Sequence, residues 1–394
     1  MEEKLNILIM NPLALENGRG GEISSLELAF GLQNFFNITL MDTNILLGKR
    51  LLSQKIIKKK LIKINSYKRM RFAIFKFFSK VFTFPYPLEI LKLNKEIKNN
   101  DIVYTSTSTI KIDLVFIFLS LINRNTKFII GFRKPLYSEK LFSLYNFKYR
   151  CSLLFFSLLK KRFYFHTISF HAKKFLENFY NPDKTFHIIH GVDLDDFSID
   201  TIKEKQDEVL NFIYVGYLDN IHKGVGILLN GIEKVIEEYP NFNIFFEFCG
   251  EGPLESKLVK LQKIYPSFIK YNGYISNEKI SEYYKRNDVL LFTSRREPFG
   301  RVIIEALASN LVIICTKTIG TVEILKNKKF AFFLRKLNSD VIREKIYFIY
   351  KLWKEQKLEF RRLQAATKIY AFQNYSSTEE INTFRKLFNN IRKM

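Results

Sequence analysis

The chain has 394 residues, of which 47% are hydrophobic and 26% are charged, and its formal net charge is +24. This composition is too apolar for a disordered protein, and the length favours two domains over one small module. Three cysteines lie far apart in the sequence (Cys151, Cys249 and Cys315), so they form neither a metal-ligand cluster nor a disulfide framework. We therefore expect a protein of a reducing compartment.

The first residues predict a buried strand rather than a signal peptide. Glu2 and Glu3 stand where a signal peptide carries positive charge, and the apolar run ends at Asn11. The longest apolar stretches, 114–122 and 151–159, are about half of the ~20 residues that a helix needs to cross a bilayer. We therefore expect a chain that does not span a membrane, although it could lie on one.

Short apolar runs then alternate with longer amphipathic stretches, which is typical of an α/β protein. A glycine-bearing loop at 17–21 precedes a helix from about Ser24, and the segment 193–209 is polar enough for a linker. The predicted strands are 5–10, 38–41, 101–104, 127–131, 163–169, 187–189, 212–215, 244–248, 268–271, 289–292 and 312–315. Because the alternation restarts after the linker, we expect two doubly wound domains, with ligands at the carboxyl ends of their strands.

One segment concentrates the basic charge. No acidic residue occurs between Thr43 and Leu88, and the apolar residues of 72–82 are interleaved with the basic ones. This mix is typical of a helix at an anionic membrane surface, and it also suits a nucleic-acid backbone. Taken singly, the aromatics are more typical of a helix core; their place in an acid-free, basic segment makes a membrane or acceptor role an equal alternative. The basic residues are Lys49, Arg50, Lys55, Lys58, Lys59, Lys60, Lys63, Lys68, Arg69, Arg71, Lys76 and Lys80.

The strongest chemical signal lies in residues 294–308. Glu297 stands in a loop after a predicted strand, a Phe-Gly pair opens a helix, and Glu305 follows eight positions after Glu297. A helix N-terminus attracts phosphate, whereas ionised carboxylates only accept hydrogen bonds and so suit the hydroxyls of a ribose or sugar. From the spacing alone, an ordinary loop charge and helix charge is the commoner explanation.

With this motif in place, the sequence resembles the glycosyltransferases of family 4, which are retaining enzymes of the GT-B fold. Their E-x7-E motif, followed by an alanine-rich helix, matches Glu297, Phe299, Gly300, Glu305 and Ala306. The resemblance covers nearly the whole chain. The other matches, in the family's order, are Gly20-Gly21-Glu22, Asp101-Ile102-Val103, Gly191-Val192-Asp193, Val215-Gly216, Lys223-Gly224, Gly250-Glu251-Gly252-Pro253 and Gly320-Thr321-Val322-Glu323-Ile324.

The resemblance implies an α/β architecture of two Rossmann-like domains that face each other across a cleft. Residues 1–195 would form the acceptor-side domain and residues 196–377 the domain that binds a nucleotide-sugar donor. The last segment, 378–394, would form a helix that crosses back and packs on the N-terminal domain.

The resemblance also implies retaining, metal-independent transfer of a sugar, with no cofactor besides the nucleotide diphosphate-sugar donor. Lys223 and Glu297 would be catalytic: Lys223 would neutralise the diphosphate leaving group and Glu297 would contact hydroxyls of the donor sugar. Glu305 would bind the ribose. Asp193 and Asp195 imitate a D-x-D metal site, but they fall in the interdomain pattern and we assign them no metal. The remaining donor-binding residues would be Gly20, Gly21, Gly216, Phe299 and Gly300.

Three positions depart from the family's pattern. Tyr217 replaces an arginine of the usual diphosphate clamp, the loop 131–135 lacks the usual histidine, and Asn310 replaces a glycine after the motif helix. The last change is mild because asparagine also tolerates a left-handed helix cap. Either another cation completes the clamp, with Arg295, Arg296 and Arg301 as candidates, or catalysis is slow.

The acceptor implied is a glycan, a lipid-linked sugar or a protein. Because the densest basic run lies in the acceptor half, a lipid-linked or membrane-proximal acceptor explains the net charge better than DNA or RNA does. We therefore predict a cytoplasmic enzyme at the inner face of a membrane, with no nucleic-acid partner. The alternative is a catalytically silent relative of the same fold that binds an anionic membrane or nucleic acid through its basic surface.

Overall fold

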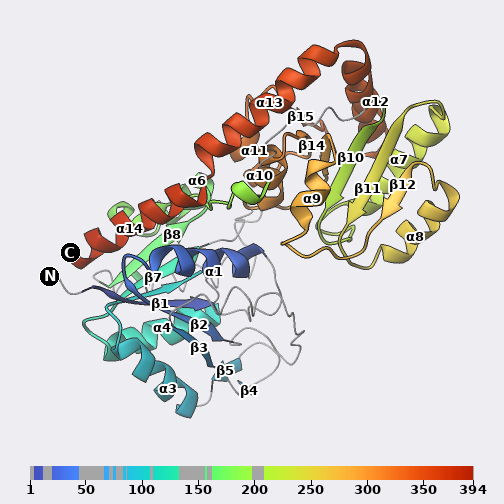
Figure 1. The fold of residues 1–394 in the computed structure, drawn as a ribbon. Helices are drawn as coiled ribbons and strands as arrows, with labels where there is room; N and C mark the ends of the chain where they lie inside the picture. The colour runs from blue at the N-terminus through green and yellow to red at the C-terminus, as the bar shows by residue number, and fades with distance from the viewer. Residues whose placement is uncertain are drawn as a thin grey trace. The chain divides into compact units, whose positions relative to one another are not determined.

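The computed structural model describes residues 4–11, 20–43, 66–70, 74–76, 83–85, 87–106, 110–132, 156–157, 162–197 and 208–393. By their contacts these residues form two compact units. The N-terminal unit comprises Met1–His190 together with Thr378–Met394, and the C-terminal unit comprises Gly191–Ser377. Each unit is built on its own sheet with helices around it (Figure 1).

The N-terminal unit contains a sheet of seven parallel strands in the order β3-β2-β1-β6-β7-β8-β9. Its inner strands are apolar runs that are buried on both faces, as expected where helices cover both sides of a parallel sheet. The strands are β1 (Asn6–Asn11), β2 (Asn37–Thr43), β3 (Tyr67–Met70), β6 (Ile102–Thr105), β7 (Lys127–Phe132), β8 (Phe163–Thr167) and β9 (Thr185–His187).

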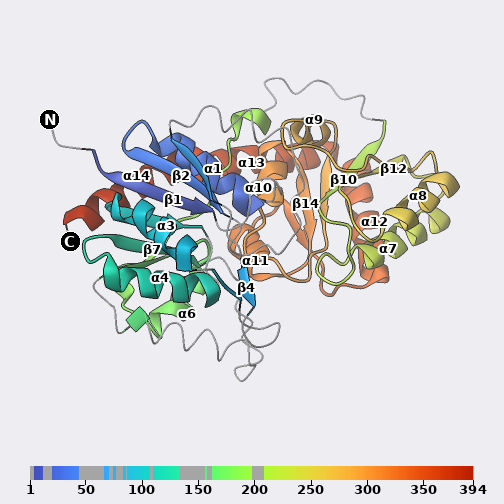
Figure 2. The ribbon, with the colours of Figure 1, turned by 90° about the horizontal axis from the view of Figure 1, so that it is seen from below.

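Helices cover the two faces of this sheet. Figures 1 and 2 show α1 and α14 on one face and α3 and α4 on the other. Two core clusters agree with this division, because one joins α1 and α14 to alternate strand residues and the other joins α3 and α4 to the intervening ones. The helices are α1 (Gly20–Leu32), α3 (Pro87–Lys98), α4 (Ile110–Ile122), α6 (Phe170–Glu177) and α14 (Ser377–Lys393), and a 3-10 turn, η2, covers Pro182–Lys184.

The C-terminal helix α14 packs on the N-terminal unit, which confirms that part of the predicted fold. The Phe388 ring meets the edge of Phe36 with centroids 5.8 Å apart, and the Phe384 ring meets Tyr104 at 5.4 Å. Helices α1 and α14 approach closely at Gly31, where an added Cβ would lie 2.2 Å from the side chain of Ile381.

The chain passes between the units at two neighbouring points. In the C-terminal unit, Val192 accepts a hydrogen bond from the N–H of Ser377 (3.0 Å) and donates one to the carbonyl of Tyr375 (2.9 Å). In the N-terminal unit, Nδ1 of buried His190 lies 2.8 Å from Oε1 of buried Glu380. The outgoing and returning segments are therefore tied together on both sides of the crossing.

The C-terminal unit contains a sheet of six parallel strands in the order β12-β11-β10-β13-β14-β15. Its strands are β10 (Leu210–Val215), β11 (Ile244–Cys249), β12 (Ile269–Tyr271), β13 (Val289–Phe292), β14 (Val312–Cys315) and β15 (Ala331–Phe333). Its helices are α7 (Val225–Glu238), α8 (Glu255–Ile264), α9 (Ile280–Lys285), α10 (Arg301–Ala308), α11 (Ile319–Leu325), α12 (Ser339–Glu355) and α13 (Lys357–Asn374), and a 3-10 turn, η3, covers Asp195–Phe197.

The strand order of the C-terminal sheet creates a switch point. Strand β10 pairs with β11 on one side and with β13 on the other. The loops that follow β10 and β13 therefore leave the same edge of the sheet next to each other, which is where α/β folds bind ligands. The predicted α/β class, with two doubly wound parallel sheets, is confirmed.

The structure corrects three sequence-based expectations. Residues 67–70, 74–76 and 83–85 are strands (β3; β4, Ile74–Lys76; β5, Thr83–Pro85), so the basic segment is not one surface helix. Aromatic and β-branched residues favour a pleated strand, and a net-charge argument ignores that preference. Helix α1 begins at Gly20 rather than near Ser24, and β9 lies two residues earlier than predicted.

Within the described ranges, no helix is both long and apolar enough to cross a bilayer. Most of the basic segment, including 49–65 and 77–82, lies outside the described residues.

Candidate functional site

An ion pair joins the two loops at the switch point of the C-terminal sheet. Lys223 lies in the loop between β10 and α7, and Glu297 lies in the loop between β13 and α10. Their side chains meet with Nζ of Lys223 2.9 Å from Oε2 of Glu297. These side chains remain 27% and 16% exposed respectively. The pair predicted to be catalytic is therefore brought into direct contact, within reach of solvent.

Asp219 fixes the backbone that carries Lys223. One oxygen of its carboxylate accepts the N–H of His222 at 2.7 Å and the N–H of Lys223 at 2.9 Å. The Thr293 hydroxyl, at the end of β13, donates to the carbonyl of Lys223 at 2.9 Å. The loop is thus held both from within and from the neighbouring strand, so the lysine ammonium is presented from a defined position.

Glu305 lies in the second turn of α10 and is only 9% exposed. Arg301, one turn earlier on the same helix, donates from Nε to Oε1 of Glu305 at 2.9 Å. The hydroxyl of fully buried Tyr284, on α9, donates to Oε2 at 3.2 Å. Burial, and then the charge of Glu305, raises the pKa of Tyr284, so this hydroxyl stays protonated and remains a donor.

The residue before helix α10 is a glycine that permits a sharp turn. Gly300 has φ 105° and ψ 57°, a left-handed conformation that other residues rarely adopt. The preceding loop is held by helix α11, because the backbone carbonyl of Glu297 accepts the N–H of Gly320 at 3.0 Å. The first N–H groups of an α-helix lack intrahelical partners, so the N-terminus of α10 offers donors beside the Lys223–Glu297 pair.

Two glycine loops pack backbone to backbone at the ends of β10 and β11. The N–H of Gly216 donates to the carbonyl of Cys249 at 3.0 Å. A Cβ on Gly250 would lie 1.9 Å from the carbonyl oxygen of Gly216, so only glycine fits at 250. The loop that leads to Lys223 is therefore seated directly on the loop after β11.

A buried tyrosine lies beneath the same loops. The hydroxyl of Tyr214 donates to the carbonyl of Tyr217 at 3.0 Å. Burial, and then the negative charges of Asp219 and Glu297, raises the pKa of Tyr214. The tyrosine therefore stays neutral and serves to support the loop.

The structure brings together the predicted residues of the C-terminal unit. Lys223, Gly216, Glu297, Gly300 and Glu305 follow or flank the carboxyl ends of β10 and β13, and Phe299 is buried within the same loop as Glu297. Gly20 and Gly21 belong to the N-terminal unit, where they form the first turn of α1 instead of the preceding loop.

The structure also describes residues at the positions that depart from the family's pattern, and the cations that could replace the missing arginine. Tyr217 is 51% exposed, and Arg295 and Arg296 are exposed, whereas Arg301 contacts Glu305. Asn310 adopts φ 62°, the left-handed conformation expected of a glycine replacement. Of the loop 131–135, only Gly131 and Phe132 fall within the described residues.

Sequence reasoning missed Tyr284 and Asp219. An aspartate shortly before a Lys-Gly turn is a signal for side-chain capping of a loop, so Asp219 could have been found. Nothing local distinguishes Tyr284, whose role depends on the packing of α9 against α10. Within the described part of the chain, no group of three histidine, cysteine or acidic side chains could hold a metal.

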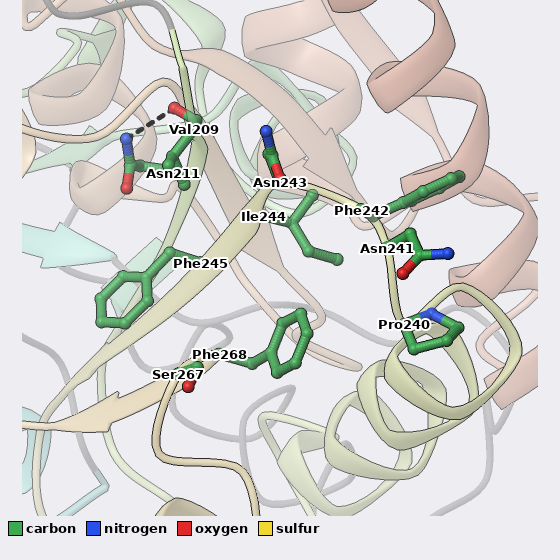
Figure 3. Close-up of a pocket in the computed structure, with 10 residues that line it drawn as sticks. All are labelled: Val209, Asn211, Pro240, Asn241, Phe242, Asn243, Ile244, Phe245, Ser267 and Phe268. Carbon is green, nitrogen blue, oxygen red and sulfur yellow. Dashed lines mark hydrogen bonds between the residues drawn. The ribbon is translucent and has the colours of Figure 1, made fainter.

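A separate pocket of about 610 Å³ lies at the opposite edge of the C-terminal sheet, where β10, β11 and β12 begin. Figure 3 shows its lining of aromatic and amide side chains, including Phe245, Phe268 and Asn243. No titratable side chain lines it, so this pocket does not supply the chemistry of the switch-point loops.

Two doubly wound parallel sheets, each with helices on its faces, are the architecture of the GT-B fold. Residues 196–364 match the family model described as "Glycosyl transferases group 1". Over this segment the match confirms the resemblance seen in the sequence.

Two curated relatives illustrate the sequence match. An uncharacterized glycosyltransferase of Methanocaldococcus jannaschii is 26% identical over 172 residues, which are 41% of this chain and 43% of that protein. The gpi3 subunit of the Schizosaccharomyces pombe phosphatidylinositol N-acetylglucosaminyltransferase is 25% identical over 154 residues, 39% of this chain and 33% of that protein. The match spans less than half the length of either relative.

The similarity to solved structures covers more of the chain than the sequence matches do. The Anabaena protein HepE, solved in complex with UDP and glucose, matches with a TM-score of 0.71 and 16% identity over 98% of this chain and 99% of that chain. At this identity the likeness establishes the GT-B fold.

Proposed function

We propose that this protein is a retaining glycosyltransferase that moves a sugar from a nucleoside diphosphate-sugar to an acceptor, without a metal. The observation that carries the proposal is the Lys223–Glu297 contact of 2.9 Å at the N-terminus of α10, the helix that also carries Glu305. Breaking the anomeric C–O bond leaves its electron pair on the diphosphate. A fixed cation and a helix N-terminus are the groups that stabilise such developing charge.

Each residue has a defined part in this proposal. Lys223 exchanges its contact with Glu297 for the diphosphate, and Glu297 accepts hydrogen bonds from donor-sugar hydroxyls. Glu305 accepts hydrogen bonds from the ribose hydroxyls, because a carboxylate offers about four acceptor positions, and Arg301 and Tyr284 occupy two of them. The backbone of Gly216, Phe299 and Gly300 lines the donor site. Gly20 and Gly21, in the first turn of α1, remain proposed donor-binding residues of the N-terminal unit.

The first test of this proposal is nucleotide binding by the purified chain. We expect one nucleoside diphosphate of a panel, with UDP as the first candidate because HepE was solved with it, to raise the melting temperature. Lys223→Ala and Glu305→Gln should lose most of that stabilisation and of sugar transfer. Lys270→Ala, which removes an exposed lysine on β12, is the matched control. A wild type that no nucleoside diphosphate stabilises would favour the catalytically silent alternative.

Metal independence has its own measurement. We expect transfer to continue in excess EDTA, since Lys223 and the N-terminus of α10 supply the positive charge that a metal would otherwise provide. Activity that appears only with an added divalent ion would contradict this and would favour a metal-binding role for Asp193 and Asp195.

We further propose a lipid-linked acceptor and a location at the cytoplasmic face of a membrane, with glycan or protein acceptors as outcomes of an acceptor screen. The support is the basic segment 49–80 and the similarity to a phosphatidylinositol N-acetylglucosaminyltransferase subunit. Flotation with anionic liposomes should exceed flotation with neutral ones and weaken with salt. Replacing Lys58, Lys59 and Lys60 by glutamate should abolish it, whereas the same change at exposed Lys260, Lys263 and Lys270 should not.

A further inference from the structure

The proposed donor site has a shortage of positive charge. Lys223 is already paired with Glu297 and Arg301 with Glu305, and Asp219 adds a third carboxylate. A bound diphosphate brings at least two more negative charges into a partly buried place, where uncompensated charge is costly. A second cation is therefore required close to Lys223 and Glu305.

Arg301 meets this requirement by position. It is the first residue of α10 and follows Gly300. A Cβ added to Gly300 would lie 3.6 Å from Cγ of Glu297. Its side chain is only 20% exposed, and its Nε lies 2.9 Å from Oε1 of Glu305. Arg295 and Arg296, by contrast, have exposed side chains in the preceding loop. Arg301 thus directly follows the turn beside the carboxylate paired with Lys223, and its side chain contacts the carboxylate proposed to hold the ribose.

We propose that Arg301 is a donor-binding residue that contacts Glu305 and the donor's phosphate group together. The inference rests on the proposed function, because it needs Glu305 to hold the ribose. The ribose hydroxyls and the first phosphate belong to one sugar ring and its 5′ carbon, so a cation on Glu305 lies next to that phosphate. A guanidinium is planar and carries five N–H donors, which lets it contact a carboxylate and a phosphate at once.

The rival explanation is that Arg301 acts only by orienting Glu305. The ligand series uridine, UMP and UDP separates the two, since only the last two carry phosphate. For Arg301→Leu we expect at least tenfold weaker binding of UMP and UDP and less than threefold weaker binding of uridine, measured by calorimetry or competition. Arg301→Lys keeps the charge and should recover part of the loss. Arg362→Leu, at a side chain 79% exposed on α13, should change none of the three.

A double-mutant cycle gives a second, independent reading. In a Glu305→Gln background, Arg301→Leu should still weaken UDP binding at least fivefold if Arg301 contacts phosphate. An equal loss for uridine and UDP, or disappearance of the effect in the Glu305→Gln background, would overturn the proposal. Full UDP affinity in Arg301→Leu would overturn it as well. A wild type that binds no nucleotide would instead count against the proposed function, so the two failures are distinct.

Discussion

Glu305 depends on partners from two helices. Arg301 comes from its own helix and Tyr284 from α9, and each contacts a different oxygen of the carboxylate. A buried carboxylate held on both sides has a fixed direction, so it can receive hydroxyl groups without reorganisation. The arrangement makes Tyr284 a positioning residue that no sequence motif reveals.

Tyr284→Phe tests this role with almost no change in volume. Removing a hydrogen bond to a charged acceptor costs about 1.5 kcal/mol, so we expect roughly tenfold weaker nucleoside diphosphate binding. Tyr283→Phe, at the neighbouring position of α9, is the control. Calorimetry should show the loss for Tyr284→Phe only. Equal affinities of the two variants would contradict the role.

The protonation of Tyr284 adds a pH prediction. Its pKa is raised well above the ordinary value of 10.0, chiefly by burial. A raised pKa means that the protonated form, and the stability it contributes, persists below the ordinary value and is lost only as the pH rises through the folded-state value. The affinity ratio of wild type to Tyr284→Phe should therefore stay constant from about pH 6 to pH 9. A ratio that falls within this range would show that the hydroxyl ionises earlier.

The sequence singled out Glu297 and Glu305 because they flank a Phe-Gly turn at the start of a helix. Their roles, and that of Lys223, were implied by the family resemblance and not by the spacing. Arg301 stands four positions before Glu305, so their contact could have been predicted from the helix period alone. The contact with Tyr284 could not, because it depends on how α9 packs against α10.

At the level of elements, the two loops after β10 and β11 behave as one structure. They share hydrogen bonds, and at Gly250 their backbones approach too closely for any side chain. The turn that follows β11 therefore fixes the position of the loop that carries Lys223.

Gly250→Ala should disturb both loops. The added methyl group would lie 1.9 Å from the Gly216 carbonyl oxygen, so the loops must separate, at a cost of about 2–4 kcal/mol in unfolding free energy. Gly273→Ala is the control, because its φ of 68° is also positive, although smaller than the 147° of Gly250, and nothing lies within 4 Å of the new methyl. Thermal melting and nucleotide affinity should both fall further for Gly250→Ala. Indistinguishable variants would mean that backbone strain alone decides the effect.

The elements were predicted well where apolar runs are regular and poorly in the basic segment. Strands such as β13 and β14 are short apolar runs, buried along their length, so their type follows from the sequence. In the segment 67–85, charge suggested a surface helix, whereas β3 instead extends the N-terminal sheet by pairing with β2. Pairing of that kind depends on a partner strand that local charge does not reveal.

On the scale of the molecule, the N-terminal unit takes part of its core from the far end of the sequence. Phe384, Leu387, Phe388 and Ile391 of α14 belong to the same cluster as residues of α1 and the first sheet. The pattern of the last residues predicts an amphipathic helix, but only the family resemblance indicated where it packs.

The variant Phe388→Ala measures how much α14 contributes to the stability of the N-terminal unit. The ring is fully buried, so its removal should lower the unfolding free energy by about 3–5 kcal/mol and reduce the melting temperature of the N-terminal unit. Lys386→Ala, at an exposed position of α14, should leave melting unchanged. Comparable melting of the two variants would show that α14 contributes little to this core.

The crossing at His190–Val192 and Tyr375–Glu380 also has a consequence for synthesis on the ribosome. The C-terminal unit is one continuous stretch, so all of its strands have been made before residues 378–394 appear. The sheet of the N-terminal unit is translated first, but one of its faces lacks the helix α14 until that segment leaves the ribosome. The unit that begins translation first is therefore the last to be completed, and during that interval its apolar face needs protection from aggregation.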